Sequence, residues 1–227
     1  MNYNFKTIIM KKRFLIFLFL VSLSVFSQND SISSTVFSLT PRSNKDIRVN
    51  GIAIGLGINM GDENTLSKIN GLNIEINPLS IFILMFDDPS RRGFSESSTA
   101  TINGISLSSG HSNQNEDIVY NGLQFSLFST SHSCNGISLN GFYNYATNMN
   151  GVHGSFLLNY SKKSNGLFVS FSNYSEINNG LQIGVFNKTE NFYGVQLGVI
   201  NKTKKQKGLQ IGLWNINSKR SMPFLNW

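Results

Sequence analysis

The sequence has few charged residues, a single cysteine, four prolines and, after residue 30, no stretch with a sustained helical apolar rhythm. Charged side chains make up 14% of the 227 residues, which argues against long helices covered with ion pairs. The lone Cys134 excludes an intramolecular disulfide. Gly, Ser and Asn are abundant instead, and Phe occurs 18 times. This composition favours strands joined by polar turns and predicts an all-β protein.

Recognisable catalytic and metal-binding motifs are also missing. His111, His132 and His153 each stand alone, without a second ligand at metal spacing. Asp87-Asp88 precedes a proline and suits a turn cap, and Gly55-Leu56-Gly57 lacks the helix that a nucleotide-binding loop needs. The sequence contains no serine elbow, Cys/His pair or phosphate-binding loop. We therefore predict no enzyme activity, no catalytic residues, no cofactor and no metal.

The formal charge of +7 does not indicate nucleic-acid binding. The first 27 residues carry four cations and no acid, so the rest of the chain has a net charge of +3. Most other cations lie in expected turns, such as Lys202, Lys204, Lys205 and Lys207. A solvated turn is the simpler interpretation of these lysines.

Residues 1–27 have the three parts of a secretory signal peptide. Lys11-Lys12-Arg13 precedes the apolar run Phe14–Val21, and small residues follow up to Ser27. The run is too short for a confident membrane-spanning helix. We expect cleavage after Ser27 and a mature domain of residues 28–227, without a lipid anchor because no cysteine lies near the cleavage site.

The mature chain is organised around one sequence repeat, here called a cassette, that occurs three times between residues 179 and 215. Gly180, Gly194 and Gly208 are 14 residues apart, and each is followed by alternating residues such as Leu181, Gln182 and Ile183. Alternation with period two is typical of a strand with two unlike faces, and a fixed period indicates a repeat architecture. We expect the fully apolar side to be the buried side, or the lipid-facing side. On that basis Ile183→Asp should disturb folding more than Gln182→Glu.

Similar repeats extend over most of the chain. Ten cassettes begin at Gly51, Gly71, Gly104, Gly122, Gly136, Gly151, Gly166, Gly180, Gly194 and Gly208. All but the last two of these glycines follow Asn, in the Asn-Gly pair that tolerates the positive φ of a tight bend. The apolar run Leu79 to Phe86 is either a strand or a buried turn of helix, which periodicity does not decide.

One cassette reads Gly-Leu-Gln-Ile-Gly-Leu-Trp-Asn, and related cassettes occupy residues 180–187 and 194–201. These cassettes resemble the Gly-x-Gln-Ile-Gly repeats of exported bacterial surface-repeat proteins. The close resemblance covers residues 180–215 and a looser one covers 50–215. It implies an exported location and a repeat structure. Some members of that group are lipoproteins, whose lipid-attachment cysteine this chain lacks.

Two architectures suit these repeats. In the first, Ser34–Thr40, the ten cassettes and Met222–Trp227 form about 12 strands of an antiparallel meander that closes into a β-barrel, with Leu, Ile and Val facing lipid. In the second, each 14-residue unit is one coil of a parallel β-solenoid, with Leu, Ile and Val stacked inward. The uneven spacing of the early cassettes favours the barrel.

These observations predict a non-enzymatic protein of the outer membrane or cell surface with a structural or interaction role. Its expected partner is the outer membrane or envelope surface, and the alternative locations are the periplasm and the medium. A small outer-membrane pore or channel is the alternative function, and a secreted enzyme with an unfamiliar site is the third.

Overall fold

The computed structural model describes residues 33–40, 47–56, 67–78, 80–86, 94, 98, 100–110 and 118–227. The predicted signal peptide lies outside the described residues. The elements are β1 (Ser33–Thr40), β2 (Ile47–Gly55), β3 (Ser67–Glu75), α2 (Ser80–Phe86), β4 (Ala100–Ser108), β5 (Ile118–Ser155), β6 (Leu158–Val169), β7 (Ser172–Ile216) and β8 (Ser221–Asn226). The prediction of an all-β protein is confirmed, and the run Leu79 to Phe86 contains the short helix α2.

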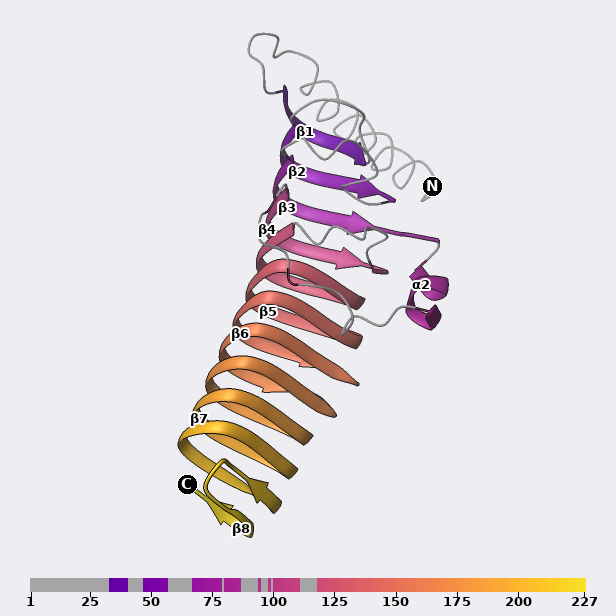
Figure 1. Cartoon of the computed structure of the whole chain (residues 1–227). Helices are drawn as coiled ribbons and strands as arrows, with labels where there is room; N and C mark the ends of the chain where they lie inside the picture. The colour runs from indigo at the N-terminus through magenta and orange to yellow at the C-terminus, as the bar shows by residue number, and fades with distance from the viewer. Residues whose placement is uncertain are drawn as a thin grey trace, which may run out of the picture.

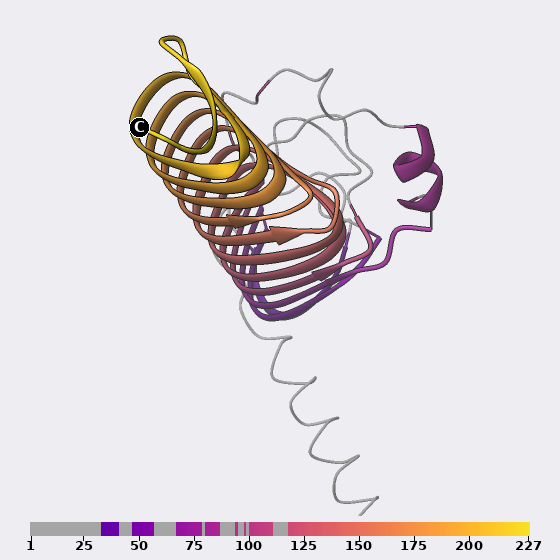
Figure 2. The same ribbon diagram turned by 90° about the horizontal axis from the view of Figure 1, so that it is seen from below.

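The strands form a single sheet in which each strand lies beside its neighbours in the sequence. The order is β1 to β8, and every pair from β1·β2 to β6·β7 is parallel. Asn150 pairs with Asn165, which pairs with Asn179, so successive strands are offset by one repeat. The chain therefore winds as a spiral whose turns, here called coils, stack along one axis (Figures 1 and 2).

The expected antiparallel barrel is wrong for the described strands. A meander reverses direction at each turn, whereas these strands run parallel and return through the second half of each coil. β8 pairs with β7, and β1 lies at the other end of the sheet order, so the C-terminal strand does not close onto the first. The parallel arrangement with repeat-length coils is the one that the solenoid alternative described.

Each coil turns tightly at its repeat glycine, which follows Asn in the first eight of the ten coils. Gly194 has a φ of +132°, and a Cβ placed on it would lie 2.0 Å from the carbonyl oxygen of Gly180 in the previous coil. Only glycine permits both this backbone conformation and this approach. The preceding asparagines stack into a ladder in which each Nδ2 donates to Oδ1 of the previous coil at 2.7–2.8 Å. The ladder joins Asn50, Asn70, Asn103, Asn121, Asn135, Asn150, Asn165 and Asn179.

The interior of the C-terminal coils is polar, which corrects the expected face assignment. Gln182, Gln196 and Gln210 are at most 1% exposed, and Leu181 and Ile183 beside them point outward. Nε2 of Gln196 donates to Oε1 of Gln182 at 2.7 Å, and Nε2 of Gln210 donates to Oε1 of Gln196 at 2.8 Å. Identical amides in register satisfy one another, as in the Asn/Gln ladders of stacked parallel strands. The solenoid alternative, with its aliphatic interior, was wrong here.

A second asparagine ladder lies in the interior of the last coils. Asn159, Asn173, Asn187, Asn201 and Asn215 are buried, and each of the first four donates to the next at 2.8–3.0 Å. The space beside this ladder is filled, because a Cβ on Gly198 would meet the Gly184 oxygen at 2.5 Å. The flat amide groups of the asparagines therefore fit beside the glycines, and a larger side chain at the position of Gly198 would have no room.

The N-terminal coils have a more conventional apolar interior. Val49, Ile69, Ile102 and Tyr120 stand two residues before the corner glycine and pack in one column with Cys134. Each is at most 3% exposed. Polar side chains such as Asn73 and Ser106 are buried in these coils as well, so the N-terminal interior is mixed, whereas amide ladders run through the interior of the last coils.

The C-terminal end of the spiral is covered by β8. This strand pairs antiparallel with the last coil, and Pro223 within it cannot donate a backbone hydrogen bond. Asn226 is fully buried and its Nδ2 donates to Oε1 of Gln210 at 3.1 Å, which continues the glutamine ladder into the cap. Repeat proteins need such terminal caps, because an open edge pairs with other chains.

Candidate functional site: an exposed apolar sheet face

The outward side of the strands that follow the corner glycines is apolar from one end of the spiral to the other. It consists of the first, third and fifth residues after each of the ten repeat glycines, which we call the apolar face. Of these thirty positions, only Ser109, Gly141 and Gly154 lack a large apolar side chain, and none is charged. The glycine register of the parallel strands aligns these residues in continuous rows.

Much of this apolar surface is open to solvent. Leu139 is 49% exposed, Val169 is 41% exposed and Leu213 is 63% exposed. The more exposed members include Ile52, Leu56, Ile76, Ile105, Leu107, Leu123, Phe125, Leu127, Ile137, Val152, Phe156, Phe171, Val199 and Ile211. Isolated exposed apolar residues are ordinary, but a contiguous patch of this size marks an interaction surface.

A shallow groove crosses the apolar face between β3 and β5. Ser109 occupies the row in which Ile76 and Leu127 stand on the coils to either side, and its small side chain leaves a hollow of about 410 Å³. The hollow is lined by Ile74, Glu75, Ile76, Leu107, Ser108, Ser109, Phe125, Ser126 and Leu127. The groove was not predicted from the sequence, although the polar residue in an otherwise apolar row was its signal.

The helix α2 leaves the spiral at one border of this groove. Ser80 holds its first turn: Oγ of Ser80 donates to the Asn77 carbonyl at 2.7 Å and lies 2.9 Å from Oγ of Ser109. Leu84 packs against the aromatic cluster of Phe128, Tyr143 and Tyr145. The opposite side of the helix is open, with Phe82 63% and Phe86 82% exposed.

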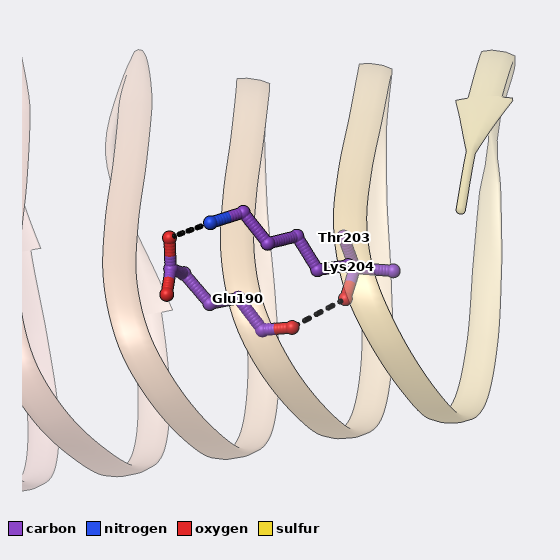
Figure 3. Close-up of polar contacts among 3 residues, drawn as sticks. All are labelled: Glu190, Thr203 and Lys204. Atoms are coloured by element: carbon purple, nitrogen blue, oxygen red, sulfur yellow. Dashed lines mark hydrogen bonds and ion pairs between the residues drawn. The ribbon is translucent and has the colours of Figure 1, made fainter. Parts of the chain in front are cut away.

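In the C-terminal coils the charged residues lie away from the apolar face, in the second half of each coil. Lys204 forms an ion pair with Glu190 of the previous coil at 2.5 Å, and Oγ1 of Thr203 donates to the Glu190 carbonyl at 3.5 Å (Figure 3). The bridge raises the pKa of Lys204. Lys188 lies over the ring of Tyr174, 5.1 Å from its centroid. These exposed contacts add little stability, but they keep the charges off the aliphatic rows.

The histidines and the cysteine singled out from the sequence are dispersed in the structure. His153 is fully buried, stacks on Phe168 and shares a hydrogen bond of 2.7 Å with Oγ of Ser138. Burial lowers its pKa to about 4, so it is neutral at pH 7. Burial likewise raises the pKa of Cys134 to about 12, which leaves an unreactive thiol. His132 is half-buried, and His111 and Asp87-Asp88 lie outside the described residues.

A buried carboxyl group and a tyrosine stack, of which only Tyr145 is fully buried, were not expected from the sequence. Glu75 is 1% exposed beneath the groove, at the position where Gly184 and Gly198 stand in later coils. Tyr145, Tyr160 and Tyr174 form a stack along the coils, with centroids 5.2 and 4.4 Å apart. Within the described ranges, no three His, Cys, Asp or Glu side chains are grouped as metal ligands. The prediction that the protein is not an enzyme stays a prediction.

Comparison with known protein families, curated proteins and solved structures finds no match to this chain. Among the described residues, no helix has the length and apolar character needed to cross a membrane.

Proposed function

We propose that this protein is a non-enzymatic β-repeat protein of the bacterial outer envelope or cell surface. In this proposal it acts by binding through the apolar face. The observation that supports it is the row of outward Leu, Ile, Val and Phe side chains on all ten repeats, with no charged residue among them. An uncovered surface of this kind is costly in water, so a protein that retains it has a partner for it.

The interior supports a structural role in this proposal. Successive amides of the buried ladders are bonded to one another, and each corner glycine from Gly71 onward packs on the one before it. Such contacts link nearest-neighbour coils and hold the outward rows in line. The inward side chains are committed to this framework, so recognition falls to the outward side of the sheet.

The pore that was the alternative function depended on a closed barrel. The parallel strands and the buried ladders offer no specific observation in favour of it.

Fractionation of a bacterial host that has an outer membrane tests the proposal. The chain, expressed with residues 1–27, is expected in the envelope fraction and should resist a high-salt wash, because apolar contacts are not screened by salt. The double variant Leu139→Glu/Val169→Glu should move to the soluble fraction. The control Tyr193→Glu/Ser218→Glu makes the same change of charge at exposed positions off the face and should stay with the envelope. A wild-type chain that remains cytoplasmic with its leader uncleaved would contradict the proposal.

A further inference from the structure

The apolar face has the size that a stable dimer needs. Ten strands at a spacing of about 4.7 Å span roughly 47 Å, and five residues at about 3.3 Å each give a width of roughly 16 Å. The product is about 750 Å² on each copy. A standard protein–protein interface buries about 800 Å² per partner, so pairing two such faces comes close to that value.

A second copy of this chain also matches the face in shape. The rows of the apolar face repeat at the spacing between parallel strands, and a second copy has the same spacing along its whole length. The ridges of one copy therefore fill the grooves between the rows of the other over all ten coils, as in two sheets packed about 10 Å apart. A partner without this repeat would match over only a few strands.

The charge distribution favours one orientation of the two copies. Residues 28–117 contain six Lys or Arg and ten Asp or Glu, a net charge of −4. Residues 118–227 contain nine Lys or Arg and two Asp or Glu, a net charge of +7. Side by side in the same direction, the two basic halves would repel each other. In the opposite direction, the two basic halves lie at opposite ends of the pair, which removes this repulsion.

We propose that two copies of this chain pack their apolar faces together as an antiparallel, two-fold symmetric dimer. This inference rests on the proposed function and names the partner of the same surface. Retention at the envelope then belongs to the paired protein, and the face variant loses it together with the pair. The two-fold axis passes through the middle of the face, between the coils of Gly136 and Gly151. Leu139 then lies close to its counterpart in the partner, and Leu213 on the last coil lies roughly 40 Å or more from its own counterpart.

The mass of the purified protein in solution provides the first test, measured by sedimentation velocity over a range of concentrations. Wild type and the control Tyr193→Glu/Ser218→Glu should have twice the mass of the chain. Leu139→Glu/Val169→Glu should have the mass of one chain and an unchanged far-UV circular dichroism spectrum. A wild-type monomer at every concentration overturns the inference, as does a dimer that the face variant leaves intact.

Cross-linking provides a second test that adds no charge to the face. In a Cys134→Ser background, Leu139→Cys should form a covalent dimer with a short bis-maleimide, whereas Leu213→Cys should not. Efficient cross-linking of Leu213→Cys indicates a parallel pair and refutes the antiparallel arrangement. A monomer that binds neutral phosphatidylcholine vesicles through the face identifies a lipid surface as the occupant instead. A monomer that still fractionates with the envelope overturns the dimer alone and leaves the proposed function standing.

Discussion

The inverted arrangement of the two strand faces can be tested by placing the same new side chain at two adjacent residues. Gln196 points inward and is fully buried, whereas Leu197 points outward and is half-buried on the apolar face. We compare Gln196→Glu with Leu197→Glu. An aliphatic interior would make the second variant the more damaging one. The structure makes the first more damaging.

The magnitude follows from the contacts of Gln196. Its Nε2 donates to Oε1 of Gln182 at 2.7 Å, so a carboxylate there places two acceptor oxygens against each other. The substitution removes a hydrogen bond worth about 1 kcal/mol and leaves a buried acceptor without that donor, which costs about 1–3 kcal/mol. Burying the charge without a cation costs several kcal/mol more. We expect a loss of at least about 4 kcal/mol, a large part of the 5–15 kcal/mol stability typical of proteins.

Leu197→Glu should cost far less in the isolated chain. The new carboxylate points into solvent. The free energy of unfolding therefore falls only by the contribution of a half-buried leucine side chain, about 1 kcal/mol. Urea denaturation followed by far-UV circular dichroism measures both values. Because Leu197 belongs to the proposed dimer surface, the comparison is made at concentrations where both variants sediment as monomers. A larger loss for Leu197→Glu than for Gln196→Glu would refute the interior assigned to the glutamines.

Three further predictions concern a corner, a buried base and the cap. Gly194→Ala should destabilise the protein by at least about 3 kcal/mol in the same assay, because it forces a Cβ at positive φ against the Gly180 oxygen. Gly141→Ala should cost far less, because its Cβ would lie 3.3 Å from the Leu127 oxygen, where a shift of a few tenths of an ångström accommodates it. His153 has a folded-state pKa of about 4, below its unfolded value near 6.5, so its contribution is complete above pH 6.5 and is lost as the pH falls to 4. That loss is roughly 3 kcal/mol, and His153→Phe, which suits the column of Phe168, should abolish this part of the pH dependence of unfolding. Deleting Ser221–Trp227 removes β8 and the side chain that donates to Gln210. Amide hydrogen exchange should then become faster in the last coil only. Faster exchange throughout the chain would show that β8 stabilises more than the end of the spiral.

The sequence by itself determined the strands, their period and the tight corners. Alternating residues after Gly180 and Gly194 predict strands, and Asn179-Gly180 predicts the bend between them, since these preferences act within a few residues. The 14-residue spacing brings Asn187 and Asn201 to equivalent positions in any repeat structure. These features are local, and the structure contains them where the sequence indicates.

Tertiary structure alone decided the direction of pairing and which face is buried. Alternation shows that the two faces of a strand differ, but it does not say which one points inward. Gln196 is a poor interior residue in isolation, because an unpaired buried amide is costly. It becomes a good one when parallel neighbours place Gln182 and Gln210 directly beside it in register, so that donor meets acceptor at each step. That match exists only between coils, and it leaves the leucines and isoleucines of the same strands on the outside.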